Sequence, residues 1–75
     1  MKLPILSPKE LCRFLEKEGF QLIRQKGSHC FYRHSDGRTT VVPVHSNREV
    51  KRGLLKAILE QIKMEREEFF KKLKR

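Results

Sequence analysis

Two tight turns, at Gly27-Ser28 and at Asp36-Gly37, divide the middle of the chain into three short stretches of strand-forming residues. Both dipeptides favour chain reversal, and Asp-Gly between β-forming runs is a strong hairpin signal. Turns this short join antiparallel neighbours, so the sequence predicts a three-stranded antiparallel meander. The predicted strands are Phe20–Lys26, His29–His34 and Thr39–Val44. Strict alternation along the first strand places four residues on one face: Phe20, Leu22, Arg24 and Lys26.

A helix start precedes the first strand. Ser7 is a candidate N-cap residue, and Pro8 suits the first helical position. Glu10, three residues after Ser7, can complete a capping box with it. Apolar residues then recur at helical spacing until Gly19, which suits the left-handed position that ends many helices. The pattern predicts a helix over residues 8–18.

A second amphipathic pattern follows the strands. Apolar residues at helical spacing predict a helix over residues 50–63, with Ser46 and Glu49 as a candidate capping box at its start. Residues 64–75 continue with helical character and end in a basic run. The predicted fold class is α+β, in the order α-β-β-β-α with a further short C-terminal helix. Because each main helix carries one apolar stripe, we expect both on one face of a three-stranded sheet whose other face is open.

Size and charge narrow the function. The chain has 75 residues, so residues 1–75 are predicted to form a single domain. The formal net charge is +9, and such a surface attracts polyanions, either nucleic acid or an acidic protein. Two widely spaced cysteines are too few for the disulfide framework of a small secreted domain. With no apolar run near the roughly 20 residues that span a bilayer, we expect a cytoplasmic protein without a membrane partner.

His29 is the first candidate for chemistry. It follows the Gly27-Ser28 turn at the start of a strand, where a side chain can project from a rigid frame and still meet solvent. Histidine exchanges protons near neutral pH because its unperturbed pKa is about 6.5. RNA cleavage needs a base for the 2′-hydroxyl proton, an acid for the leaving oxygen and cations for the extra phosphoryl charge. The candidate RNA-contacting residues around His29 are Arg24, Lys26, Gly27, Ser28 and Arg33. The alternative is an ordinary polar residue at a strand end.

The remaining histidines and two aromatic residues leave alternatives open. His45, just after the third strand, is either a second acid–base group or a residue that holds the loop by hydrogen bonds. His34 is interpreted as a solvent-facing residue before the second turn. Phe31 and Tyr32 point to opposite faces, so one should join the core and the other, if exposed, could stack on an RNA base. The spacing of histidines and cysteines matches no structural zinc pattern, so neither a metal nor another cofactor is expected.

Several segments along the chain form a combined pattern: Gly27-Ser28-His29, Tyr32, Asp36-Gly37, Val42-Pro43-Val44-His45 and Lys51-Arg52-Gly53-Leu54-Leu55-Lys56-Ala57-Ile58-Leu59. Together they resemble the HicA toxins, which are small mRNA interferases of prokaryotic toxin–antitoxin pairs. The resemblance extends from about Leu6 to Phe70. It implies a fold like the double-stranded RNA-binding domain, ribosome-independent cleavage of mRNA and a catalytic histidine matching His29. It also implies neutralisation by a HicB-type antitoxin, with the toxin monomeric alone and hetero-oligomeric in the complex.

The chain departs from that family at two positions near its C-terminus. Lys63 stands where the family often has Gly or Asn, and Glu65 where it often has a Ser or Thr helix cap. The sequence therefore leaves open whether the last two helices are separate or continuous. The predicted function is a metal-independent endoribonuclease toxin. The alternatives are a non-catalytic RNA-binding module of the same fold and a protein-interaction module whose basic face serves only an acidic partner.

Overall fold

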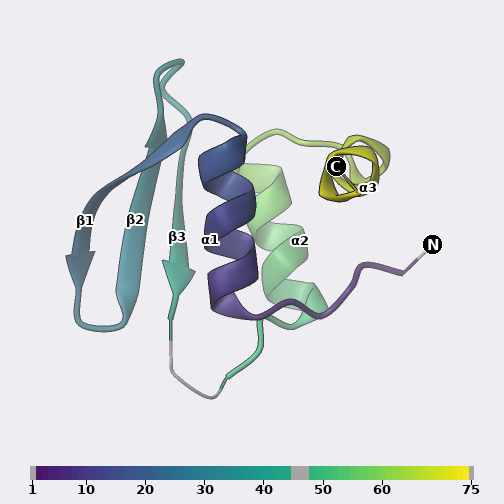
Figure 1. Cartoon of the computed structure of the whole chain (residues 1–75), viewed down its shortest axis with the longest axis horizontal. Helices are drawn as coiled ribbons and strands as arrows, with labels where there is room; N and C mark the ends of the chain where they lie inside the picture. The colour runs from purple at the N-terminus through teal and green to yellow at the C-terminus, as the bar shows by residue number, and fades with distance from the viewer. Residues whose placement is uncertain (1, 45–47, 75) are drawn as a thin grey trace.

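The computed structural model of the chain describes residues 2–44 and 48–74. Its elements are α1 (Pro8–Lys17), β1 (Phe20–Lys26), β2 (His29–His34), β3 (Thr39–Pro43), α2 (Arg52–Gln61) and α3 (Arg66–Leu73). The strands form one antiparallel sheet in the order β1-β2-β3 (Figure 1). The predicted fold class, α+β with the arrangement of the double-stranded RNA-binding domain and a short third helix, is confirmed. Within the described ranges, no helix is long and apolar enough to cross a membrane.

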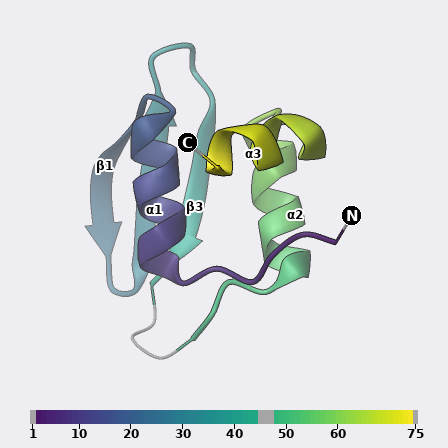
Figure 2. The same ribbon diagram turned by 45° about the vertical axis from the view of Figure 1, so that its right-hand side comes forward.

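The core lies between the sheet and the helices on one side of it. Figures 1 and 2 both show α1 against the strands, α2 beyond it on the β3 side, and α3 next to α2. The capping box that starts α1 is present, because the Ser7 hydroxyl accepts from the Glu10 N–H at 3.0 Å and the Ser7 N–H donates to the Glu10 carboxylate at 2.9 Å. The largest fully buried side chains come from the sheet, from all three helices and their ends, and from the segment before α2: Leu11, Leu15, Phe20, Val42, Val50, Leu55, Ile58, Ile62 and Phe69.

The start of α2 differs from the prediction. The helix begins at Arg52 rather than at residue 50, and its N-cap, Lys51, makes no side-chain capping hydrogen bond. Val50 instead pairs with Leu6: the Val50 N–H donates to the Leu6 carbonyl at 2.7 Å, and the Leu6 N–H donates back at 3.3 Å. A residue in such an extended bridge cannot belong to the first helical turn. The predicted capping box therefore does not start α2, and its first residue, Ser46, lies outside the described residues.

The solvent-facing interpretation of His34 is wrong. Its side chain is 22% exposed, and its ring packs edge-on against Phe20 with 5.1 Å between the ring centroids. Phe20 and His34 are directly opposite in the β1–β2 ladder, so their side chains share the helix-covered face. The Asp36 N–H also donates to His34 Nδ1 at 3.1 Å, which holds the ring at the turn.

A break separates α2 from α3, although neither residue expected at such a break is present. Lys63 has a φ of 55°, and its N–H donates to the Glu60 carbonyl at 3.2 Å. The Met64 N–H donates to the Leu59 carbonyl at 2.9 Å, which completes the hydrogen-bond pair of a Schellman motif. Glu65 then serves as the N-cap of α3 without a side-chain capping hydrogen bond. The question that the sequence left open is answered: the two helices are separate.

The left-handed backbone at Lys63 leads to the first prediction. A non-glycine residue in this conformation costs about 1–2 kcal/mol, whereas glycine adopts it readily but adds entropy to the unfolded chain. We expect Lys63→Gly to raise the free energy of unfolding by about 1 kcal/mol in urea denaturation. Lys63→Ala is the control, because it removes the charge and keeps the strain. Equal stability of the two variants would contradict this explanation.

Candidate active site on the open sheet face

A β-bulge in β1 decides which side chains share a face with His29. The β1–β2 register shifts between Leu22 and Arg24, which makes Ile23 the extra residue. One extra residue reverses the alternation of side chains beyond it. Arg24 and Lys26 therefore lie on the open face, whereas Phe20 and Leu22 lie on the face that carries the helices. The prediction that all four share one face is wrong for this reason.

Side chains along β2 alternate between the core and the open face. Cys30 and Tyr32 are 6% and 2% exposed and belong to the core. His29, Phe31 and Arg33 consequently face the open side, where His29 is exposed and Phe31 is half-buried. Tyr32 is thus the core aromatic and Phe31 the one on the open face, and stacking of Phe31 on an RNA base stays a prediction.

The open face brings together most of the residues that the sequence singled out. Lys26 lies directly opposite His29, and Arg24 lies opposite Phe31. The Arg24 guanidinium sits over the Phe31 ring, with Cζ 4.6 Å from the ring centroid. This cation–π contact keeps the planar guanidinium of Arg24 on the same face of the sheet as His29. Arg33 adds another cation on the same side of β2.

The β1–β2 turn sets the position of His29. Gly27 has a φ of 59°, as the first central residue of a two-residue type II′ turn requires. The Gln25 side-chain amide donates to the Gly27 carbonyl at 3.2 Å. The Val44 N–H donates to the Ser28 carbonyl at 2.6 Å and so ties the end of β3 to this turn. Gly27 and Ser28 hold His29 by backbone geometry, and contact between them and RNA stays a prediction.

Behind the open face, β2 is held to α1 by a polar cluster. The Tyr32 hydroxyl donates to the Glu16 carboxylate at 3.2 Å. Burial, helped by the hydrogen bonds with Cys12 and Glu16, raises the pKa of Tyr32, and burial likewise raises the pKa of the Cys12 thiol. Both groups are therefore neutral at physiological pH, and Cys12 and Cys30 are free thiols.

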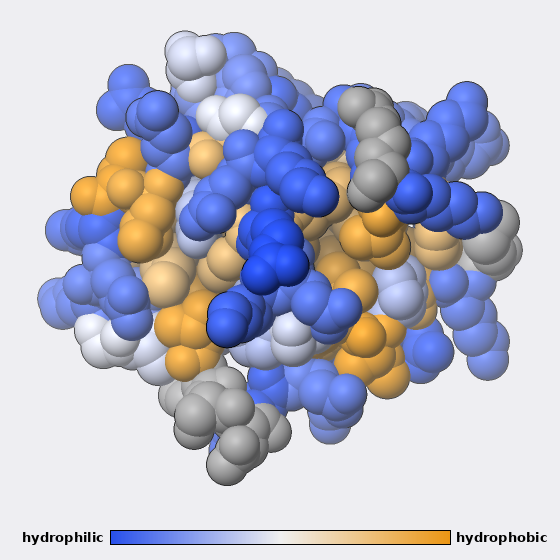
Figure 3. All heavy atoms as spheres, viewed as in Figure 1, coloured by the Kyte–Doolittle hydropathy of each residue, from blue (hydrophilic) through white to orange (hydrophobic). Residues whose placement is uncertain are grey.

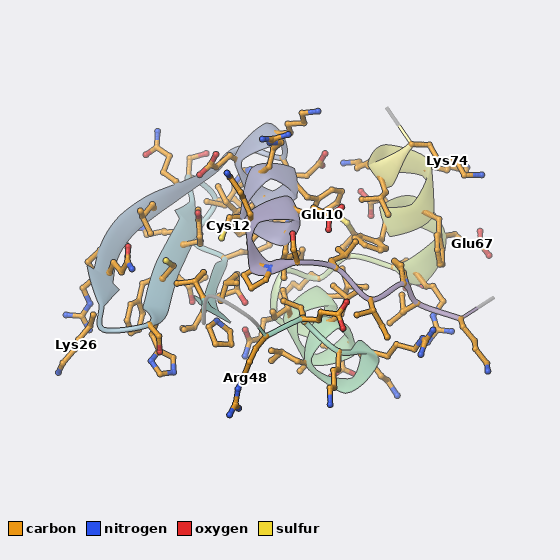
Figure 4. All side chains as sticks on the ribbon, turned by 60° about the horizontal axis from the view of Figure 1, so that its bottom comes forward. Glu10, Cys12, Lys26, Arg48, Glu67 and Lys74 are labelled. Atoms are coloured by element: carbon orange, nitrogen blue, oxygen red, sulfur yellow. The ribbon has the colours of Figure 1, made fainter. Side chains whose placement is uncertain are left out.

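Arg48 is a basic residue that sequence reasoning missed. It follows β3, whose last residue pairs with His29 at the start of β2. Figure 4 shows Lys26 extending outward at the left, beside the β1–β2 turn, and Arg48 extending outward at the bottom, ahead of α2. The predicted meander could have located it: β3 runs antiparallel to β2, so the chain leaves β3 at the end where β2 begins. His45 lies outside the described residues, so both readings of it stay predictions.

Some cations serve the fold rather than this face. Arg38 Nη1 donates to the Ile62 carbonyl at the end of α2 at 2.5 Å, and Arg52 Nε donates to the Leu3 carbonyl at 2.5 Å.

In residues 2–44 and 48–74, no three histidine, cysteine or acidic side chains are grouped so that they could hold a metal ion.

The fold and the open basic face define a small α+β protein of the double-stranded RNA-binding-domain type. Residues 8–64 match the family described as the HicA toxin of bacterial toxin–antitoxin systems. This match spans more than half of the chain, so the chain belongs to the HicA toxin family and is a toxin of a toxin–antitoxin pair. A comparison with curated proteins gave no match. Helix α3 follows the matched region.

Proposed function

We propose that this toxin is a metal-independent, ribosome-independent endoribonuclease that cleaves mRNA, with His29 as its principal acid–base group. The observation that carries the proposal is the position of His29. It is exposed at the start of β2, directly opposite Lys26, and shares the open face with Arg24 and Arg33. A proton-transfer group and several cations on one accessible surface suit chemistry on a phosphodiester.

The proposed reaction uses the 2′-hydroxyl of the RNA as the nucleophile. As that oxygen attacks phosphorus it loses its proton, and the bond to the 5′-oxygen breaks as that oxygen gains one, leaving a 2′,3′-cyclic phosphate and a 5′-hydroxyl. His29 is the group that takes or returns a proton, and the side chains of Lys26, Arg24 and Arg33 stabilise the charge that develops on the phosphoryl oxygens. A second proton-transfer group completes the cycle, and His45 is the candidate for it from the sequence.

The experiment that tests this function is single-turnover cleavage of a labelled RNA by the purified protein, with and without EDTA. We expect cleavage at the same rate in both, since the proposed acid–base and electrostatic groups are protein side chains. An RNA that is bound but stays intact would favour the non-catalytic RNA-binding module. An RNA that is neither bound nor cut would favour the protein-interaction module.

The basic face also predicts how RNA binding responds to salt. When the logarithm of the binding constant is plotted against the logarithm of the salt concentration, each phosphate of a single strand that the protein neutralises adds about −0.7 to the slope. Contacts through Arg24, Lys26 and Arg33 should therefore give a slope of about −2. Arg33→Ala should reduce its magnitude by about 0.7, as measured by fluorescence anisotropy. An affinity that barely changes with salt would refute the role assigned to this face.

The toxin role implies an antitoxin, and we propose that it is of the HicB type. An acidic antitoxin surface over the open face would block both RNA binding and access to His29, because one face carries both. We further propose that residues 1–75 act as one domain in the cytoplasm, monomeric alone and hetero-oligomeric with the antitoxin. Hydrogen exchange or chemical labelling that left His29 fully reactive in the purified complex would count against this mode of inhibition.

A further inference from the structure

The outer edge of the sheet carries an apolar pair that the fold does not use. β1 is an edge strand, and six of its seven residues are exposed. Leu22 and Ile23 are adjacent on it and are 47% and 54% exposed. Figure 3 shows apolar side chains gathered at the left-hand side of the molecule, over β1, with polar ones around them. Exposed aliphatic residues on an edge strand invite pairing with another chain.

The helical layer covers β1 only at its first residue, Phe20, which is 2% exposed, and the six residues after it are exposed. Leu22 lies opposite Tyr32 in the ladder, and both face the helices, yet Tyr32 is 2% exposed and Leu22 is 47% exposed. Ile23, at the bulge, lines a shallow hollow together with Gln21 and Arg33. Leu22 therefore projects on the helix-facing side of the edge strand, and Ile23 lies on the side of Gln21 and Arg33, so the pair flanks this edge from both faces of the sheet.

Charge decides what kind of partner fits this edge. Arg24 and Lys26 follow the aliphatic pair on the same strand, and Arg33, opposite Gln21 on β2, lines the same hollow as Ile23. A second copy of this chain would bring another net charge of +9 to a basic edge, whereas an acidic protein would be attracted to it. RNA would gain from the cations, but aliphatic side chains offer its bases no aromatic face for stacking.

We propose that the outer edge of β1 docks an extended segment of the acidic antitoxin, which adds a strand to the sheet. Main-chain hydrogen bonds from the unpaired side of β1 provide affinity in this mode of recognition, and side-chain contacts provide specificity. Apolar residues of the segment pack on Leu22 and Ile23, and its carboxylates pair with Arg24 and Lys26. The inference rests on the toxin role given by the family and is independent of RNA cleavage.

The test measures binding of the purified partner antitoxin of this toxin, by isothermal titration calorimetry at fixed salt. We expect the double variant Leu22→Gln/Ile23→Gln to bind at least about tenfold more weakly than wild type. The matched control is Ile5→Gln/Leu54→Gln, which changes two other exposed aliphatic residues, 43% and 37% exposed, and should bind within about twofold of wild type. Equal affinities for the two double variants, or no binding by the wild type, would overturn the proposal.

Amide hydrogen exchange of the wild-type complex provides a second readout that needs no variant. The amides of β1 that point away from β2 should exchange more slowly in the complex than in the free toxin. Unchanged exchange along Phe20–Lys26 would overturn the proposal. So would sedimentation that shows a dimer of the wild-type toxin and only a monomer of the double variant, because the edge would then bind a second copy of this chain. RNA cleavage is assayed on the same samples, so loss of the proposed nuclease function is seen separately from loss of docking.

Discussion

His29→Ala is expected to lower the single-turnover rate of RNA cleavage by about 10²–10⁴-fold, which is the contribution of a positioned acid or base. The side chain is exposed at the first position of β2, so its removal should change the free energy of unfolding by no more than about 0.5 kcal/mol. RNA affinity should persist, because phosphate contacts from lysine and arginine dominate it. The expected result is thus a folded protein that binds RNA and cuts it far more slowly than the wild type.

The control for this substitution is Gln21→Ala, which changes another exposed residue of the sheet, opposite Arg33. It should fold, bind and cleave like the wild type. A His29→Ala protein that cleaves at nearly the wild-type rate would remove this residue from the mechanism. One that melts far below the wild type would assign it a structural role. Thermal melting, RNA binding and cleavage are measured on one preparation of each variant.

Phe69→Ala is expected to destabilise the fold by about 3–5 kcal/mol, the usual cost of truncating a buried phenylalanine. Phe69 is fully buried in α3, and its ring packs edge-on against Phe14 of α1 with 5.0 Å between the centroids. A chain of this size has a total stability of roughly 4–11 kcal/mol, so the loss is a large fraction of it. Helix α3 lies beyond the matched family region, yet it completes the core.

Thermal unfolding followed by circular dichroism measures this effect. The Tm of Phe69→Ala should fall by more than about 10 °C. Phe70→Ala is the matched control, because the neighbouring ring is only partly buried and its loss should lower the Tm much less. If both variants melt close to the wild type, α3 is not part of the cooperative unit.

Local signals in the sequence located most of the fold. The capping residues Ser7 and Glu10, and the turns at Gly27 and at Asp36-Gly37, act over a few residues, so their consequences could be predicted. The start of α2 could not, because it depends on pairing between Leu6 and Val50, which are far apart in the chain. The break before α3 also resisted prediction, because it requires Lys63 in a conformation that its residue type disfavours.

The candidate site divides in the same way. The place of His29 after a tight turn follows from neighbouring residues alone. The side chains that surround His29 could not be predicted in this way. The bulge at Ile23 places Arg24 and Lys26 on the sheet face that carries His29, and a bulge is a property of two paired strands. Which of the two adjacent aromatics on β2 is buried depends on which face the helices cover, and that is decided by the packing of the whole chain.

The most direct test of the central claim compares an RNA with a DNA of the same sequence in single-turnover reactions containing EDTA. The proposed mechanism requires the 2′-hydroxyl and uses His29 for proton transfer, so the wild type should cut the RNA and leave the DNA intact. The RNA products should carry 2′,3′-cyclic phosphate and 5′-hydroxyl ends. Cleavage of both nucleic acids, or of neither, would contradict the claim.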